Sequence, residues 1–448
     1  MIPLFKLAEK AAEKIKKCNS VIQIVSHYDA DGIAAASIVA LALNQINKAF
    51  QITIIKKLDE GIIRELKERE PEIVIFTDMG SGYLDLIKEL KCVIIIADHH
   101  EIVYQWDSDK LIHINSELFG IPGISGSGTA YILAKGILHI EEGDAKSLAT
   151  LAVVGTMGDS ASSNFEMFKE SEYIKQEKGL KLFGRFSRPL HKSIGLADIP
   201  GINDESKAIQ FLSEIGIKFR ENGEWRTLSD LTQEEIKKLT DAIVLEYIKE
   251  EKPIFESSIV DNVFTLKDFP EELRDAKEFA TLLNCCGKMG EPAIGIGLCF
   301  GAKKSLEKAR NVYKNYKKLI ASYLEWVEKN WDNTEVVRKT ANANYIIAGD
   351  NIKESLVGVI ASIIQREYNE KPIFGLANGE DSVKVSARTS GNIDLGKILH
   401  EAASLCGGRG GGHCETAGCN IPFENQEKFI ELCDKLIAQD KALFLRNG

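Results

Sequence analysis

Four short segments of the chain combine aspartate, histidine and glycine where predicted strands or helices end. Three of them follow predicted strands, and the fourth follows a predicted helix. They are Ser26-His27-Tyr28-Asp29-Ala30-Asp31-Gly32, Thr77-Asp78-Met79-Gly80, Asp98-His99-His100-Glu101 and Gly155-Thr156-Met157-Gly158-Asp159. Ligands of open parallel sheets bind beyond the carboxyl ends of the strands. The segments are therefore predicted to meet in one crevice.

The four segments supply five aspartates and three histidines. Carboxylates and imidazoles are ligands that suit Mn²⁺ or Mg²⁺. Several carboxylates buried together without a cation repel one another and lose their hydration. Two cations about 3.5–4 Å apart would clamp the attacking and leaving oxygens of a phosphoryl transfer. One Asp-Gly segment alone is more often a turn, but four in one domain favour a metal site.

The elements that must position these residues indicate an α/β fold. Predicted strands alternate with helices through the first 165 residues, as in a parallel sheet with helices on both faces. These strands lie near 21–25, 52–56, 73–77 and 93–97, and the last two helices near 128–139 and 144–157. We predict four parts: an N-terminal parallel-sheet domain (1–165), a helical insertion with a cleft segment (166–300), a connecting helix (301–334) and a smaller C-terminal α/β domain (335–448).

The predicted C-terminal domain has its own strands and a glycine-rich loop. Its strands are expected at 345–348, 373–377 and 383–387, with a helix at 354–367. Glycine has no Cβ, so the loop Gly407–Gly412 would let backbone amides approach a phosphate or sugar. Arg388 ends a predicted strand and could bind a phosphate bidentately, or it could form a surface salt bridge. Cys406, Cys414 and Cys419, even with His413, do not have a usual zinc spacing.

The motifs resemble those of a known family. The pattern His27-x-Asp29-x-Asp31-Gly32, Asp78, Asp98-His99-His100 and Gly158-Asp159 resembles the four motifs of the DHH phosphoesterase superfamily. Gly408-Arg409-Gly410-Gly411-Gly412-His413 resembles the glycine-rich motif of the DHHA1 domain. Segments 113–134 and 275–290 are similar to the archaeal RecJ-like subfamily, which includes the GINS-associated nuclease. The resemblance implies a DHH domain in the N-terminal part and a DHHA1 domain in the C-terminal part.

The resemblance also implies roles for individual residues. His27 and Asp29 would hold one cation, Asp31, His99 and Asp159 another, and Asp78 would bridge both. His100 would face the scissile phosphate, and Asp98 would orient a histidine. The substrate-binding residues would be Arg388, Gly410, Gly411, Gly412 and His413. The cofactor would be Mn²⁺ or Mg²⁺, as one or two ions.

Other segments leave their alternatives open. Lys303–Lys318 carries seven basic residues and the single acid Glu307. It is either a face that follows a nucleic-acid backbone or a solvated helix face. Asn284 and Arg274 line the cleft only by resemblance, and ordinary surface or capping roles are favoured for both.

Composition limits the classes of function. The net charge of -10 argues against a non-specific nucleic-acid coat protein. The sequence has no apolar run of about 18 residues and no signal peptide. Its nine cysteines include no CxxC pair and are expected to be reduced thiols. We therefore expect a cytoplasmic protein without a membrane span.

The expected activity is that of a metal-dependent exonuclease. It would hydrolyse single-stranded DNA or RNA from an end and release mononucleotides, in DNA replication or repair. Two alternatives remain: a phosphodiesterase for short oligonucleotides or cyclic dinucleotides, and a replication scaffold that binds GINS with little catalysis. Single-stranded nucleic acid and the GINS complex are therefore the expected partners.

Overall fold

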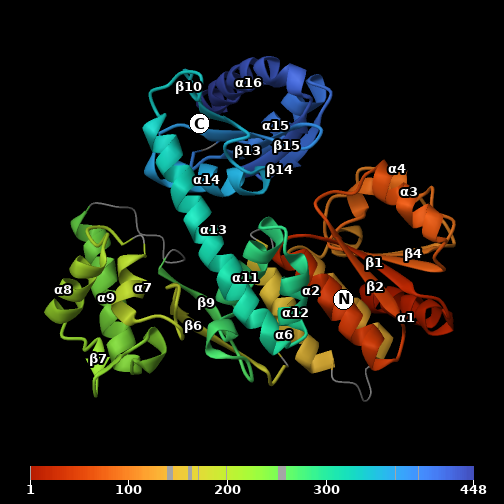
Figure 1. The fold of residues 1–448 in the computed structure, drawn as a ribbon, viewed down its shortest axis with the longest axis horizontal. Helices are drawn as coiled ribbons and strands as arrows, with labels where there is room; N and C mark the ends of the chain where they lie inside the picture. The colour runs from red at the N-terminus through yellow and green to blue at the C-terminus, as the bar shows by residue number, and fades with distance from the viewer. Residues whose placement is uncertain are drawn as a thin grey trace. The chain divides into compact units, whose positions relative to one another are not determined.

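The chain forms two compact units, Met1–Arg310 and Asn311–Gly448. A computed structural model gives the fold of both (Figure 1). It describes residues 2–138, 145–159, 164–169, 171–197, 199–250, 259–368, 370–391 and 393–447. No helix among these residues is long and apolar enough to cross a membrane.

The first unit is built on a parallel sheet of five strands in the order β2-β1-β3-β4-β5. The strands are β1 (Ile22–His27), β2 (Phe50–Ile55), β3 (Ile73–Thr77), β4 (Val93–Asp98) and β5 (Leu111–Asn115). The central strands are rich in Val and Ile and almost fully buried, as expected when both faces of a parallel sheet are covered. Because β2 lies on one side of β1 and β3 on the other, the strand order reverses beside β1, where α/β proteins bind ligands.

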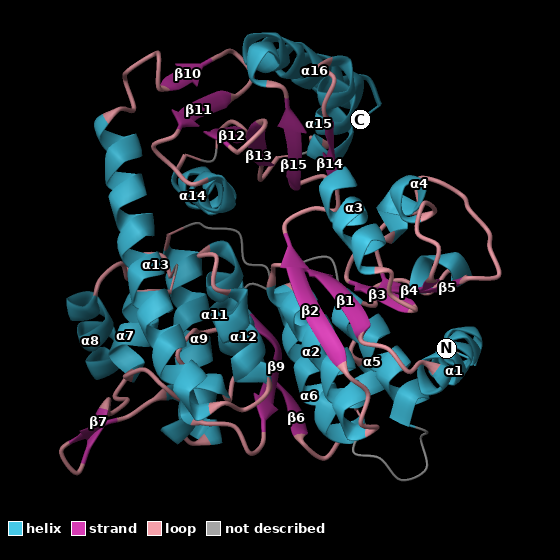
Figure 2. Ribbon diagram, turned by 45° about the vertical axis from the view of Figure 1, so that its right-hand side comes forward, coloured by secondary structure: helices cyan, strands magenta, loops and turns pink. Residues whose placement is uncertain are grey.

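Helices cover both faces of this sheet (Figure 2). On one face lie α1 (Ile2–Lys17), α2 (Ala30–Gln45), α5 (Gly126–Leu138) and α6 (Ala145–Gly158), packed against one another. On the other face, α3 (Glu60–Arg69) and α4 (Leu84–Ile87) bury Leu66 and Ile87 against Phe76. Small alanines in the middle of α2 let the neighbouring helices approach closely, and almost the whole helix is buried. The predicted α/β class is confirmed.

The predicted helical insertion begins and ends in strands that the sequence analysis missed. β6 (Ile174–Leu180) pairs antiparallel with β9 (Val260–Leu266) in a two-stranded ribbon. The segment IKQEKGL of β6 is mostly polar and resembles an exposed helix. Between these strands lie α7 (Leu190–Gly195), α8 (Glu205–Glu214), the pair β7 (Arg220–Glu221) and β8 (Glu224–Trp225), and α9 (Gln233–Lys249), around a core of their own. After β9 come α11 (Ala276–Lys288) and α12 (Pro292–Cys299).

The predicted connecting helix is α13 (Lys303–Lys329), and it extends across the boundary between the units. The second unit has a six-stranded mixed sheet in the order β10-β11-β12-β13-β15-β14. Its strands are β10 (Val337–Lys339), β11 (Asn344–Gly349), β12 (Ile373–Asn378), β13 (Val383–Arg388), β14 (Arg409–Gly412) and β15 (Thr416–Ile421). α14 (Glu354–Glu367) packs on β12 and β13, while α15 (Leu395–Leu405) and α16 (Gln426–Asn447) bury the other face.

The glycine-rich segment of the second unit is a strand rather than the predicted loop. Gly410 pairs with Cys419 and Gly411 with Gly418, which makes β14 the edge of the sheet. A Cβ at Gly410 would lie 2.2 Å from the Cβ of Cys419. Glycine therefore permits a close approach of the two strands, which a sequence-based interpretation as a loop does not reveal.

Candidate metal centre

The structure brings all four predicted segments together at the carboxyl edge of the first sheet. Ligand atoms lie within 4.8 Å of one another in each of three overlapping groups. The groups are His27, Asp29 and Asp78; Asp31, His99 and Asp159; and Asp78, Asp98, His99 and His100. The predicted meeting of these segments in one crevice is therefore confirmed.

The first group forms where β1 passes into α2. His27 Nδ1 lies 3.0 Å from Asp29 Oδ2 and 3.8 Å from Asp78 Oδ2. The other oxygen of Asp29 accepts a hydrogen bond from the Gly32 amide and caps α2. Desolvation opposes ionisation of Asp29, but His27 and the Gly32 amide outweigh it and lower its pKa. Asp29 is thus held as a carboxylate facing the histidine.

Asp78 lies between the groups. Its Oδ2 faces His27, while its Oδ1 lies 3.3 Å from His99 Nε2. The residue has a φ of 54°, which an L side chain rarely adopts, and is only 2% exposed. Burial, reinforced by Asp31 and Asp29, raises its pKa well above the ordinary value. Such a carboxylate is stable in its charged form only beside a cation, so the donor set fits a divalent metal.

The second group depends on the N-terminus of α5. Asp31 Oδ2 lies 3.9 Å from His99 Nε2, and His99 Nδ1 lies 3.8 Å from Asp159 Oδ2. Both oxygens of Asp31 also accept backbone hydrogen bonds, at 2.7 Å from Gly126 and 2.9 Å from Ser127. Burial still raises the pKa of Asp31, against the opposing effects of His99 and Ser127. The helix dipole and these amides orient the carboxylate.

Glycines leave room for these carboxylates. A Cβ at Gly126 would lie 2.4 Å from Asp78 Oδ1, and a Cβ at Gly155 would lie 2.6 Å from Asp31 Oδ1. The sequence analysis did not assign Gly126 to the site, and it gave no separate role to Gly155, which begins the fourth segment. The run Gly126-Ser127-Gly128 at the start of a predicted helix was the available signal, since such segments bind anions.

His100 lies at the rim, where Asp98 orients it. Asp98 is fully buried, and its Oδ1 lies 2.7 Å from His100 Nδ1. Desolvation disfavours the charged forms of both, but their mutual attraction lowers the pKa of Asp98 and raises that of His100 to about 9. The His100 side chain is 55% exposed. A protonated, accessible imidazole of this kind can donate a hydrogen bond to a phosphate.

A network not foreseen from the sequence supports Asp98 and His100. The Ser81 amide donates to Asp98 Oδ2 at 2.9 Å, and Ser81 Oγ lies 2.8 Å from His113 Nε2. Asn115 Nδ2 donates both to Ser81 Oγ and to the carbonyl of His100. The end of β5 therefore fixes the backbone of the DHH segment.

Helix α11 contacts the first segment directly. The Ala30 amide donates to Asn284 Oδ1 at 2.9 Å, so Asn284 caps the start of α2 beside Asp29 and Asp31. A Cβ at Gly287 would lie 1.7 Å from the carbonyl oxygen of Tyr28, so only glycine allows this approach. For Asn284 the sequence favoured a surface or capping role over a cleft position, and the structure shows this hydrogen bond to the first turn of α2. Arg274 lies near the Phe186 ring, 5.5 Å from its centroid.

The second unit holds the other predicted residues. Arg388 Nε donates to Ser362 Oγ at 2.8 Å and Nη1 donates to the Ala387 carbonyl at 2.7 Å. No ion pair of Arg388 occurs among the described residues, and burial lowers its pKa. In the sheet, Arg388 of β13 lies opposite Thr416 of β15. Ala417, the residue after Thr416, lies opposite Gly412 of β14. His413, which follows Gly412, is exposed.

The remaining expectations have mixed outcomes. Cys406 and Cys419 are buried thiols and Cys414 is exposed, and none joins a metal-binding group within the described residues. The basic side chains of α13 are exposed, with Arg310 paired to Glu272 and Lys317 over the Tyr313 ring. This geometry is compatible with both interpretations of α13.

Comparisons with known proteins agree with the motifs. Residues 21–156 match the DHH family, N-terminal domain, residues 182–260 match the DHH-CID domain, and residues 342–439 match the DHHA1 domain. The chain therefore belongs to the proteins that combine DHH, DHH-CID and DHHA1 domains. Its fold is similar to that of RecJ.

Two related proteins match different shares of the chain. The protein MJ0831 of Methanocaldococcus jannaschii is 28% identical over 97% of both chains. The single-stranded-DNA-specific exonuclease RecJ of Bacillus subtilis is 30% identical over 166 residues, which are 34% of this chain and 21% of that protein.

Solved structures share the fold. RecJ from Thermus thermophilus in complex with Mn²⁺ has a TM-score of 0.59 and 19% identity, over 97% of this chain and 55% of that one. CDC45 from Entamoeba histolytica has a TM-score of 0.56 and 13% identity, over 97% and 98%. This chain thus spans about half of the T. thermophilus chain and nearly all of CDC45.

Proposed function

We propose that the protein is a Mn²⁺- or Mg²⁺-dependent phosphodiesterase that shortens single-stranded DNA or RNA from an end. The observation that carries the proposal is the position of Asp78, whose two oxygens face His27 and His99. A carboxylate so placed can bridge two cations, one held with His27 and Asp29 and the other with Asp31, His99 and Asp159. Bound cations would neutralise the buried carboxylates, polarise the phosphate and activate water.

The residues around the metal centre divide the remaining work. His100 donates a hydrogen bond to a phosphate oxygen, because Asp98 keeps it protonated and accessible. Ser81, His113 and Asn115 hold this pair in place. In the second unit, Arg388 and the exposed His413 beside the glycines would bind nucleic acid, as the resemblance to the DHHA1 domain implies.

The substrate, the partner and the cellular location are proposed from related proteins and from the state of the cysteines. Single-stranded DNA is named as the substrate of RecJ from B. subtilis, and RecJ structures with Mn²⁺ and with Mg²⁺ share this fold. The role in DNA replication or repair, with the GINS complex as a partner, is proposed from the resemblance of segments 113–134 and 275–290 to the archaeal RecJ-like subfamily. All nine cysteines are free, which suits the reducing cytoplasm.

The test compares substrates of different length. End-labelled single-stranded DNA and RNA of about 20 nucleotides, and a dinucleotide, are incubated with Mn²⁺ or with EDTA. We expect stepwise shortening with Mn²⁺ and none with EDTA. Asp78→Asn, which accepts the positive φ more readily than alanine, should lower the rate by more than about a hundredfold.

Each outcome decides between functions. Cleavage of the dinucleotide alone would replace the exonuclease with a phosphodiesterase for short oligonucleotides. No cleavage by the wild-type protein in any metal would favour a scaffold, which a GINS-binding assay would then test. Undiminished cleavage by Asp78→Asn would disprove the metal assignment.

A further inference from the structure

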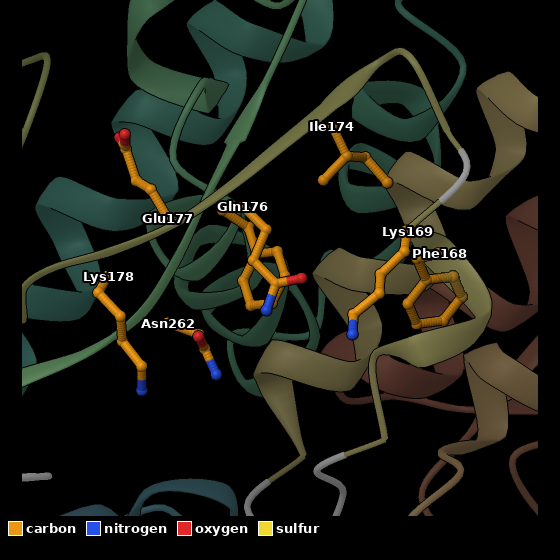
Figure 3. A pocket seen from close by; sticks show the side chains of 8 residues that line it. Phe168, Lys169, Ile174, Gln176, Glu177, Lys178 and Asn262 are labelled. Carbon is orange, nitrogen blue, oxygen red and sulfur yellow. The ribbon is translucent and has the colours of Figure 1, made fainter.

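An open pocket of about 490 Å³ lies on one face of the β6–β9 ribbon (Figure 3). Its volume is within the range of about 300–1,000 Å³ that is usual for small-molecule sites. The pocket is lined by Phe168, Lys169, Ile174, Gln176, Glu177, Lys178, Asn262 and Phe264. We call it the ribbon pocket, and every one of these residues belongs to the first unit.

The register of the ribbon places its polar side chains together. Lys178 pairs with Asn262, and Gln176 pairs with Phe264. Residues directly opposite each other on antiparallel strands project to the same face. Figure 3 shows Gln176, Lys178 and Asn262 on one side and Glu177 on the other. Glu177 forms ion pairs with Lys175 and Arg185, so its charge is already compensated.

The polar groups of the pocket have unused binding capacity. Within the described part of the chain, the side chains of Gln176 and Asn262 form no hydrogen bond, and Lys178 forms no ion pair. Lys169 extends from the other wall and pairs with the exposed Glu166. The pocket therefore presents two amides beside the ammonium group of Lys178, with the ammonium group of Lys169 on the other wall compensated by Glu166 at the surface.

This combination fits a nucleotide. Lysines bind phosphates, and Asn and Gln amides both donate to and accept from the edge of a base. The rings of Phe168 and Phe264 are buried beneath the pocket and give it an apolar wall. Phosphate and base edge would thus each meet a suitable group, above an apolar wall of buried rings.

A second, smaller pocket of about 80 Å³ lies between the β6–β9 ribbon and the end of α6. It shares Asn262 and Phe264 with the ribbon pocket, and Met157 also lines it. Asp159, a proposed metal ligand, lies two residues after Met157. The β9 strand of the ribbon pocket and the turn of α6 that leads to Asp159 therefore line one common small pocket.

We propose that the ribbon pocket binds one nucleotide of a single-stranded substrate, beyond the nucleotide that is cut. Lys169 and Lys178 contact its phosphates, and Gln176 and Asn262 contact its base. The inference rests on the proposed function, because it explains how the proposed exonuclease would prefer long strands to short ones. It makes the ribbon the element that separates an oligonucleotide from a dinucleotide.

The test compares two lysines of the same strand. Lys178→Ala removes a charge from the pocket, while Lys175→Ala removes the same charge from the opposite face. Binding of fluorescent single strands of about 12 nucleotides is measured by anisotropy in EDTA, which prevents cleavage. We expect Lys178→Ala to weaken binding about three- to tenfold. The slope of the logarithm of the binding constant against the logarithm of the salt concentration should become smaller by about one. Lys175→Ala should leave binding unchanged.

Two further arms separate the alternatives. The double variant Gln176→Ala/Asn262→Ala should lower kcat/KM for the 12-mer relative to that for a dinucleotide. Equal weakening by Lys178→Ala and Lys175→Ala would overturn the proposal. Displacement of the strand by a low concentration of AMP would also overturn the proposal, since the pocket would then bind a free nucleotide. Absence of any cleavage by the wild-type protein would instead disprove the proposed function, whatever the binding arms give.

Discussion

Asn284 shows how one uncharged side chain could position the proposed metal ligands. It accepts a hydrogen bond from the Ala30 amide, between Asp29 and Asp31, and touches no proposed ligand atom in this contact. Groups that hold metal ligands in place typically change metal affinity about 10- to 100-fold when removed. We classify Asn284 as a positioning residue, since it acts through the backbone of the segment that carries both aspartates.

Asn284→Ala is predicted to lower the affinity for Mn²⁺ about tenfold, because the start of α2 loses a cap. Calorimetric titration with Mn²⁺ would measure this change. Excess Mn²⁺ should restore the rate of cleavage, which a general loss of folding would not permit. Thr281→Ala, about one turn earlier on α11, is the matched control. Equal affinities of Asn284→Ala and Thr281→Ala for Mn²⁺ would contradict the positioning role of Asn284.

At the level of elements, α9 depends on a buried arginine. Arg226 donates from both terminal nitrogens to Glu235, at 2.8 and 2.7 Å. Glu235 also completes a capping box with Thr232 at the start of α9. The hydrogen bonds from Arg226 lower the pKa of Glu235 from 4.5 to about 2. The pair therefore joins the β7–β8 hairpin to this helix.

Glu235→Gln is predicted to destabilise the DHH-CID domain by about 2 kcal/mol at neutral pH, since a charge-assisted pair is lost. A lowered pKa in the folded state stabilises above pH 4.5, and this contribution is lost as the pH falls through about 2. The difference between variant and wild type should therefore shrink at pH 3. Thermal unfolding at pH 7 and pH 3 would measure it. A difference in stability that does not change with pH would contradict the stabilising role of the Arg226–Glu235 pair. Glu234→Gln, in the same turn and exposed, is the control.

These elements also show what a sequence can reveal. The buried strands β1, β3 and β4 are apolar runs followed by Asp and His, so the sheet and the meeting of these polar residues at its edge were predictable. The ribbon strand β6 was not, because its polar residues are exposed and carry no alternation of apolar side chains. The contact between Asp31 and the α5 amides joins residues 95 positions apart. Such a contact follows from packing and leaves only the Gly126-Ser127-Gly128 run as a local signal.

At the level of the whole molecule, the proposed metal ligands all belong to the first unit. They extend from His27 to Asp159, whereas the second unit has its own sheet and core. A ligand that binds only the folded form stabilises the unit that holds it. Metal binding should therefore act on one of two unfolding transitions.

Calorimetric unfolding is predicted to show two transitions, with only one moving to higher temperature on addition of Mn²⁺. At a hundred times the dissociation constant, the stabilisation should be about 2.7 kcal/mol. EDTA should reverse the shift, and Asp78→Asn should remove most of it. A shift of both transitions together would show instead that the units unfold as one.

The pairing of β6 with β9 makes the DHH-CID domain a removable module. Leu180 lies opposite Val260, so the polypeptide leaves the ribbon and returns to it at neighbouring points. Neighbouring strands are about 4.8 Å apart, a gap that a two-residue hairpin turn closes. A single genetic insertion or deletion between these two residues could thus add or remove the whole domain, while the order of the five parallel strands stayed intact.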